Sequence, residues 1–228
     1  MAKRSVYRVS NDYKKYIKEI EVEFTWYPGF AVSQKQKSIL DLHKEYNKIY
    51  KDDKVLEISS KSQVELGVKL SAFNLMITTK DNRTFSVESA FQSSKKFEFG
   101  GPYLDILEKG SREAKKDNRL KTSGKLISFE FYGKQWPLEP KTIFYDWLYI
   151  RAVYKNKDLA DKILGYNAFT DIEFNPNKSI NCQARSAALF VSLSKRNLLD
   201  YAMISIENYY DVIINNNKQD KMEQLSLF

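Results

Sequence analysis

A short segment that begins at Ser86 carries side chains that general acid–base chemistry uses. Its pattern predicts a helix over residues 87–97 with Ser86 as N-cap. One face of that helix, at positions i, i+3, i+4 and i+7, would hold Glu88, Phe91, Gln92 and Lys95. The macrodipole favours an ionised carboxylate at a helix N-terminus, which suits a general base or an electrostatic stabiliser. The alternative is an exposed Glu–Lys face with the phenylalanine turned into the core.

A basic stretch follows over residues 93–125. It holds nine Lys and Arg against five Asp and Glu, and the difference is half of the net charge of +8 of the whole chain. Arg112, Lys115, Lys116 and Arg119 have a spacing that suits contacts to phosphate groups. A solvated loop face is the alternative interpretation of the same charges.

A polar loop at residues 171–182 is the third candidate. Asp171 lies in an extended segment, and asparagines and serines crowd the residues that precede a helix predicted over 182–195. Backbone N–H groups at a helix start can hold a phosphate, and Arg185 would lie beside them. Loops of this composition are also common as simple turns and caps.

Composition limits the class of protein. The chain has 228 residues, a net charge of +8 and 14% aromatic residues, which favours an anionic partner and leaves some rings free for stacking on bases. A single cysteine, Cys182, excludes an internal disulfide and a cysteine-based metal site, and the single histidine, His43, predicts a surface or packing role. Without a long apolar run or a secretory leader, the sequence indicates a cytoplasmic protein with no membrane partner.

Several further elements must position these residues. Period-2 alternation predicts strands over 18–26, 54–60 and 126–132 and a hairpin from 73–79 and 83–87. Apolar spacing predicts helices over 33–50, 63–70, 138–155 and 158–165, the first with a stripe of Ile39, Leu42, Tyr46 and Ile49. Residues 201–214 fit either type of element. We expect an α+β section over 1–80 packed on a main domain of 81–214, and a flexible tail over 215–228.

Several phrases resemble one protein family. Ser86-Val-Glu-Ser-Ala-Phe-Gln-Ser-Ser-Lys95 is similar to the Glu-x-x-Phe-Gln-x-x-Lys motif of the NADAR family. Residues 97–103, 136–142, 145–150 and 174–186 resemble, in the same order, the NADAR antitoxins encoded beside DarT-type toxins. The resemblance implies an α+β, mostly helical NADAR-like (YbiA-like) domain with an N-terminal strand and helix extension.

The resemblance also implies an activity. These antitoxins are ADP-ribosyl glycohydrolases that remove ADP-ribose from guanine in single-stranded DNA, so ADP-ribose, the modified DNA and a DarT-type toxin are the implied partners. The expected catalytic residues are Glu88, Lys95 and Asp171. The expected ADP-ribose contacts are Phe91, Gln92, Arg112, Lys115, Arg119, Trp147, Phe174, Asn181 and Arg185. The expected DNA contacts are Lys96, Lys116 and Lys121. None of these sets requires a metal or a cofactor.

Two other classes of function remain open. A basic, aromatic-rich chain can bind nucleic acid or a toxin without catalysis, and release of free ADP-ribose would separate an enzyme from such a binder. An N-glycosidase that acts on a small nucleotide metabolite is also known in the wider family, although the basic stretch argues against it.

The last five residues form a separate motif. Gln224-Leu225-Ser226-Leu227-Phe228 resembles the peptide by which bacterial proteins dock on the DNA-polymerase sliding clamp. Contacts to the clamp would come from Gln224, Leu225, Leu227 and Phe228, with the polar residues 215–223 as a tether. The alternative is that this apolar end folds back on its own domain.

Overall fold

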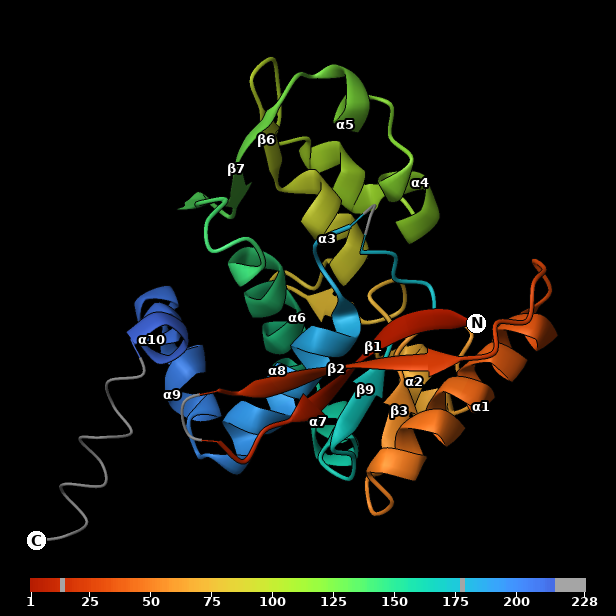
Figure 1. Cartoon of the computed structure of the whole chain (residues 1–228). Coiled ribbons are helices and arrows are strands. Elements are labelled where there is room, and N and C mark those ends of the chain that lie inside the picture. Colours follow the sequence, from red (N-terminus) through yellow and green to blue (C-terminus); the bar gives the residue numbers. More distant parts are fainter. Residues whose placement is uncertain (13–14, 177–178, 216–228) are drawn as a thin grey trace, which may run out of the picture.

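The structure is a computed structural model that describes residues 1–12, 15–176 and 179–215. Helices and strands are interleaved along the chain, which confirms the α+β class (Figure 1). The strands are β1 (Ala2–Val9), β2 (Ile17–Phe24), β3 (Val55–Glu57), β4 (Met76–Thr78), β5 (Thr84–Ser86), β6 (Lys95–Phe97), β7 (Leu126–Phe131), β8 (Lys134–Trp136) and β9 (Ala168–Thr170). The α-helices are α1 (Val32–Ile49), α2 (Glu65–Lys69), α3 (Val87–Ser93), α4 (Ser111–Lys115), α5 (Arg119–Thr122), α6 (Ile143–Lys155), α7 (Lys157–Ile163), α8 (Gln183–Lys195), α9 (Leu199–Ile204) and α10 (Ile206–Tyr210).

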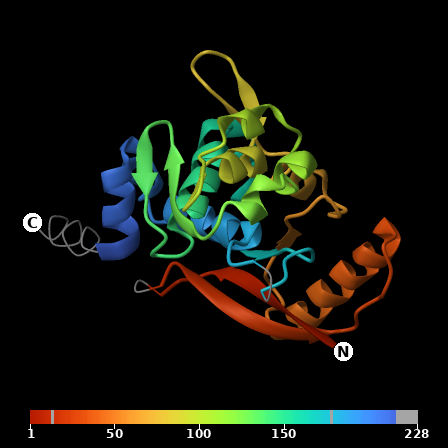
Figure 2. The same cartoon turned by 90° about the horizontal axis from the view of Figure 1, so that it is seen from above.

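A four-stranded sheet joins the two ends of the sequence. Its order is β2-β1-β9-β3, with β1 antiparallel to β2 and β9, and β3 parallel to β9. Residues 168–170, from the expected main domain, therefore pair on both sides with strands of the expected 1–80 section. Helix α1 packs beside this sheet, while α6 and α8 lie at the centre of the molecule (Figures 1 and 2).

Strand β1 was missing from the sequence-based prediction, and its burial explains why. Val6 joins the core under α1, whereas Tyr7 and Val9 join the main core around α6 and α8. Because both faces of the strand are covered, its buried positions do not show a simple polar and apolar alternation. The stripe predicted for α1 is largely confirmed, since three of its residues are buried, whereas Ile49 is exposed.

The predicted helix over 87–97 is wrong at its end. Helix α3 stops at Ser93, and Lys95 lies on strand β6. The hydroxyls of Ser93 and Ser94 both donate to the carbonyl of Ala90, and the backbone N–H of Glu130 donates to the carbonyl of Ser94. These bonds compete with further helical bonds, so the chain leaves the helix and pairs with β7.

The predicted helix over 138–155 is wrong at its start. Helix α6 begins at Ile143, after strand β8 and a turn in which the Ile143 N–H donates to the Pro140 carbonyl. Pro137 and Pro140 favour extended conformations for the residues that precede them, which argues against the predicted helix start at Leu138. The ambiguous residues 201–214 are helical, and Ser205 caps α10 by accepting a hydrogen bond from the Asn208 N–H.

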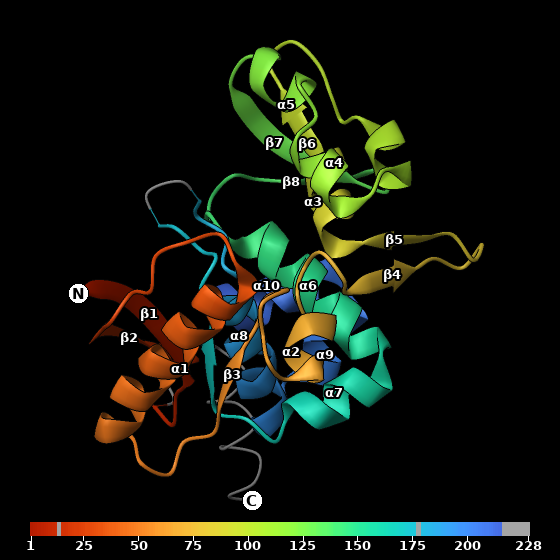
Figure 3. The same ribbon diagram turned by 90° about the vertical axis from the view of Figure 1, so that its right-hand side faces the viewer.

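The remaining predictions agree with the structure, with shorter boundaries in most cases. The strands β2, β3 and β7, the helices α2, α7 and α8, and the β4–β5 hairpin are all confirmed. Figure 3 shows this hairpin projecting from the side of the molecule, with α3 and the basic stretch following it. Within the basic stretch, the chain forms a short 3-10 helix, Leu104–Glu108, and then α4 and α5.

Candidate active site

Helix α3 presents its carboxylate from a buried first turn. Ser86 caps the helix, as predicted, because its Oγ accepts a hydrogen bond from the Ser89 N–H at 3.0 Å. Glu88 is only 6% exposed, and the Nε2 of Gln92 donates to its Oε1 at 2.9 Å. The neighbouring glutamine therefore fixes the orientation of the carboxylate.

Lys115 of α4 approaches the same carboxylate. Its Nζ lies 3.9 Å from the Oε1 of Glu88 and 5.4 Å from the ring centroid of Phe73. The lysine side chain is 60% exposed, whereas that of Glu88 is 8% exposed. A fixed carboxylate is thus paired with a cation that can move.

Lys95 reaches the site although it lies outside the helix. Its Nζ is 5.0 Å from the ring centroid of Phe91, which belongs to α3. Burial lowers the pKa of the Lys95 ammonium, an effect that the negative charge of Glu88 opposes and the positive charge of Lys115 reinforces. A lowered pKa leaves more of this amine neutral near pH 7, which is the form that can act as a nucleophile or accept a proton.

Asp171 follows strand β9 directly and lies beside a buried glutamate. Glu57 is 2% exposed, and its carboxylate accepts hydrogen bonds from the Thr170 hydroxyl at 2.6 Å and the Ile172 N–H at 2.9 Å. Burial, first, and the nearby Glu57 charge, second, raise the pKa of Asp171 above its ordinary value. Burial also raises the pKa of Glu57.

His43, on α1, contacts the same threonine that donates a hydrogen bond to Glu57. Its Nε2 lies 2.8 Å from the Oγ1 of Thr170, and burial lowers its pKa to about 4. Because the threonine hydroxyl donates to Glu57, the histidine Nε2 donates to the threonine oxygen. The histidine therefore packs from α1 against strand β9, in agreement with the packing role that the sequence predicts.

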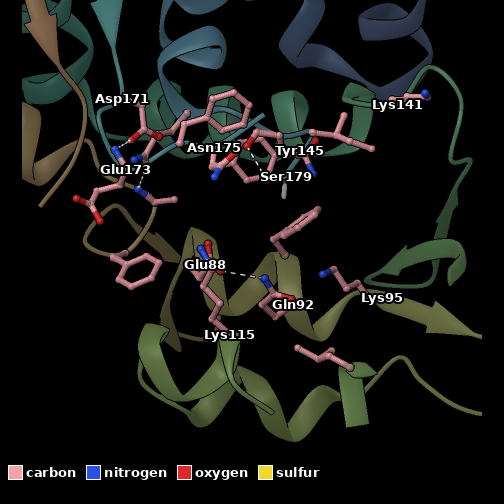
Figure 4. A pocket seen from close by; sticks show the side chains of 18 of the residues that line it. Glu88, Gln92, Lys95, Lys115, Lys141, Tyr145, Asp171, Glu173, Asn175 and Ser179 are labelled. Atoms are coloured by element: carbon pink, nitrogen blue, oxygen red, sulfur yellow. Dashed lines mark hydrogen bonds and ion pairs between the residues drawn. The ribbon is translucent and has the colours of Figure 1, made fainter. Parts of the chain in front are cut away.

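The side chains of Glu88, Lys95, Lys115 and Asp171 line one large cavity, here called the main cavity, of about 1070 Å³ (Figure 4). Helix α3 forms one wall and the loop after β9 forms the opposite wall. The cations that line it are Lys95, Lys115, Lys121 and Lys141. The carboxylates are Glu88, Glu139, Asp171 and Glu173, and the aromatic rings are Phe73, Phe91, Phe129, Tyr145 and Phe174.

Two buried polar atoms at the main cavity lack a partner within the described part of the chain. They are the Oε1 of Gln92 and the Oδ1 of Asn181, and both residues line the main cavity. A buried acceptor without a partner is costly, and a bound hydroxyl or amino group removes that cost. Gln92 and Asn181 therefore each hold, beside the main cavity, a buried carbonyl oxygen that has no partner among the described residues.

Three predicted arginines do not line the main cavity. Arg119 pairs with Asp105 at 2.6 Å and with Asp117 at 2.8 Å, and Arg185 pairs with Asp146 across α8 and α6. These carboxylates already neutralise the two guanidinium groups. Arg112 lines a separate cavity beside the main one.

The stacking and DNA-contact residues are also distributed differently from the prediction. Trp147 is 8% exposed and packs against Trp136 in the core, where it is not available to stack on a base. Phe174 lines the main cavity. Among the expected DNA contacts, Lys96 pairs with Glu130 at 3.3 Å and Lys121 lines the main cavity. Lys116 is exposed at the end of α4.

Several residues of the main cavity were not identified from the sequence. Tyr145 is buried, and its burial raises the pKa of its phenol. Gln183 accepts a hydrogen bond from the Ala72 N–H and donates to the Ile58 carbonyl, so it fastens the start of α8 to two distant loops. Lys141 precedes α6. The phrases around residues 145 and 183 resemble the antitoxins, but local spacing assigns these two residues no role.

The described residues contain neither a membrane-spanning helix nor a cluster of metal ligands. No described helix is both long enough and apolar enough to cross a membrane. Among the described His, Cys, Asp and Glu side chains, no group of three or more is arranged to hold a metal ion. The clamp-like peptide, Gln224–Phe228, lies outside the described residues.

Comparison with known proteins places the chain in a family. No curated protein matches the sequence. A family model described as DarT1-associated NADAR antitoxin matches residues 2–223. That match includes both walls of the main cavity and confirms the resemblance found in the sequence. Since it spans almost the whole chain, the protein belongs to the family of DarT1-associated NADAR antitoxins.

Proposed function

We propose that this antitoxin is an ADP-ribosyl glycohydrolase that removes ADP-ribose from guanine in single-stranded DNA. One observation carries the proposal: the oriented carboxylate of Glu88 and the amine of Lys95, whose pKa is lowered, line the same cavity (Figure 4). This combination serves cleavage of a bond between a sugar carbon and a base nitrogen. It is also the set of groups that the family resemblance implies.

The reaction replaces one bond with another. The bond between ribose C1 and the guanine nitrogen breaks, the nitrogen takes a proton, and the oxygen of water joins C1. The transition state resembles an oxocarbenium ion, so a nearby carboxylate lowers its energy or deprotonates the attacking water. Glu88 supplies that carboxylate, and Gln92 holds it in place.

Lys95 has three roles that fit its position. Its side chain can hold ribose oxygens, give a proton to the leaving guanine nitrogen, or attack C1 of a ring-opened ribose as an amine. In the third route the Lys95 nitrogen bonds to C1 while the bond from C1 to the guanine nitrogen breaks, and the guanine nitrogen takes the proton that the amine loses. Water then hydrolyses the resulting imine, which frees ADP-ribose and restores the lysine. The lowered pKa supports the amine route, because only the neutral form attacks carbon.

Asp171 acts from the opposite wall. Its raised pKa keeps more of the carboxyl protonated at neutral pH than for an exposed aspartate. A protonated carboxyl donates a hydrogen bond, so it can orient water or a ribose hydroxyl. Burial is the larger cause of this raised pKa, and the Glu57 carboxylate, which does not line the main cavity, adds to it through its charge.

Lysines take the place of the predicted arginines around the diphosphate of ADP-ribose. Lys115, Lys121 and Lys141 line the main cavity, whereas Arg119 and Arg185 are occupied by carboxylates. Phe174 offers a ring for the adenine or the guanine. We assign the diphosphate to these lysines.

Turnover tests the proposal directly. A single-stranded oligonucleotide carrying ADP-ribosyl-guanine is incubated with a hundredfold smaller amount of protein, and free ADP-ribose and unmodified oligonucleotide are measured by mass spectrometry. We expect many turnovers with equal amounts of the two products. Protection of the adduct without release indicates a binding antitoxin, and cleavage of small nucleotides alone indicates a metabolite glycosidase.

A further inference from the structure

A second cavity, of about 550 Å³, adjoins the main cavity. Ser60, Phe73 and Glu173 line both, so the two cavities meet along this shared wall. The second cavity extends from the shared wall to the start of α4, where Ser111 and Arg112 line it. A ligand too long for the main cavity can continue past Phe73 into the second.

The second cavity has two cations that are free to bind an anion. Lys61 and Arg112 line it, and neither side chain forms an ion pair or a hydrogen bond with another described residue. Arg119, a few residues further along, is in contrast held by two carboxylates. The unpaired guanidinium and ammonium are therefore available to an external phosphate.

The carboxylates of the second cavity do not cancel this charge. Glu173 is shared with the main cavity and pairs with Lys35 at 3.4 Å. Glu113 is exposed on α4. Among the described residues that line the second cavity, two cations, Lys61 and Arg112, and one carboxylate, Glu113, are thus not engaged in an ion pair. The charge left over in the second cavity is therefore positive, even when the lysines of the main cavity are not counted.

We propose that the second cavity binds the nucleotide next to the modified guanosine, with Lys61 and Arg112 on its phosphodiester. This inference rests on the proposed function. The main cavity has its own lysines for the diphosphate of ADP-ribose, so the adduct does not need the second pair. A DNA strand must continue beyond the modified nucleotide, and the shared wall at Phe73 gives it a path.

Two substrates distinguish the contacts that the protein makes to the DNA strand from those that it makes to the ADP-ribosylated nucleoside. One is ADP-ribosyl-guanosine, which has no strand phosphate, and the other is a single-stranded oligonucleotide carrying the same adduct. In the double variant Lys61→Gln/Arg112→Gln, kcat/KM for the oligonucleotide should fall about tenfold relative to kcat/KM for the nucleoside. The dependence of log kcat/KM on log salt should flatten by up to ~0.7, because the two cations neutralise one phosphate and each lost phosphate contact on a single strand removes ~0.7.

A matched control loses the same charge elsewhere. Lys37→Gln/Lys44→Gln removes two exposed cations from α1 and should keep the ratio of the two kcat/KM values and the salt dependence. Equal losses of the double variant on both substrates would assign Lys61 and Arg112 to the adduct and overturn the inference. No loss on either substrate would overturn it as well.

Binding of unmodified DNA can be measured whether or not the protein releases ADP-ribose. It therefore tests the second cavity independently of the proposed function. If the wild-type protein releases ADP-ribose from neither substrate, the proposed function fails, and fluorescence anisotropy with an unmodified single-stranded oligonucleotide still tests the second cavity. A tenfold weaker affinity in the double variant, with the melting temperature unchanged, supports the inference. An equal affinity in the two proteins overturns it.

Discussion

The Nζ of Lys115 lies 3.9 Å from the Oε1 of Glu88, and the two ends of this pair differ in freedom. The carboxylate is buried and held by Gln92, whereas the lysine is 60% exposed. The distance is near the upper limit for an ion pair, and the ammonium is largely hydrated, so the pair is loose on the lysine side. An incoming phosphate can therefore draw the lysine away at little cost and leave the carboxylate free to act on the ribose.

Glu88→Gln should reduce turnover on the modified oligonucleotide by at least ~100-fold, because the side chain keeps its shape but loses the charge that catalysis uses. Binding of ADP-ribose, measured by calorimetry, should survive. Glu65→Gln on α2 is the matched control, since Glu65 is exposed and pairs only with Lys69. Full activity in the Glu88 variant would remove this carboxylate from the mechanism.

Lys95→Arg should abolish the amine route while it keeps a positive charge. Reduction with borohydride during turnover should trap a protein–ADP-ribose adduct in the wild type and none in the variant, with mass spectrometry as the readout. Because burial lowers the pKa of Lys95, the wild-type rate should reach its plateau at a lower pH than the ordinary lysine pKa would require. An active Lys95→Arg variant with no adduct in either protein would exclude the amine route.

Glu57→Gln should move the pH profile to lower pH. Removing the charge beside Asp171 brings the pKa of Asp171 down, so the alkaline fall in kcat/KM should begin earlier. The glutamine oxygen can still accept the Ile172 N–H, which preserves the loop. A lower rate with an unchanged pH profile would indicate a purely structural role for Glu57.

The raised pKa values of Glu57 and Asp171 also predict how the stability of the folded protein changes with pH. Both carboxyl groups have raised pKa values in the folded state, so the folded state binds their protons more tightly than the unfolded state. Their stabilising contribution is complete below the ordinary carboxyl pKa and is lost as the pH rises through the raised values. The melting temperature of the wild type should fall more steeply on the alkaline side than that of Glu57→Gln.

His43 should act in the opposite direction. Its pKa is lowered to about 4 in the folded protein against 6.5 in the unfolded chain, so stability is complete above pH 6.5 and declines as the pH falls toward 4. The loss attributable to this group is at most about 3 kcal/mol. The side chain in His43→Gln cannot gain a charge, so the melting temperature of this variant should fall less steeply below pH 6.5 than that of the wild type. An equally steep fall in the two proteins would contradict the lowered pKa of His43.

Deletion of residues 224–228 should abolish binding to the sliding clamp and leave turnover on short oligonucleotides unchanged. A lone peptide of this size should bind with micromolar affinity, about −8 kcal/mol. Surface plasmon resonance with immobilised clamp measures the first effect. A melting temperature lowered by several degrees in the deleted protein would instead make the peptide a part of the folded domain.

The sequence pattern predicted those helices, strands and caps that interactions between nearby residues determine. The strand β2, the helices α1 and α8 and the Ser86 cap follow from periodicity and capping, and the residues chosen as catalytic all line one cavity. Tertiary partners decided the rest. Arg119 and Arg185 have the residue type of a phosphate ligand, but Asp105 and Asp146, which the fold brings close, occupy them.

The end of α3 likewise depends on residues that are distant in the sequence. Residues 87–97 have helical spacing, but pairing with β7, which lies some thirty residues later, overrides it after Ser93. Lys95 nevertheless reaches the main cavity, because the strand that replaces the helix leaves it close to Phe91. Lys95 thus lines the main cavity from a strand, although the sequence pattern predicts it on a helix.

The place of β9 between β1 and β3 has a consequence for the folding of a newly synthesised chain. Asp171 is attached to this strand, whose two neighbours are made long before it. Pairings over such sequence separations close long loops and form late, so a ribosome must release about three quarters of the polypeptide before the catalytic wall can assemble. The wall that carries Asp171 therefore forms only after most of the antitoxin chain has been made.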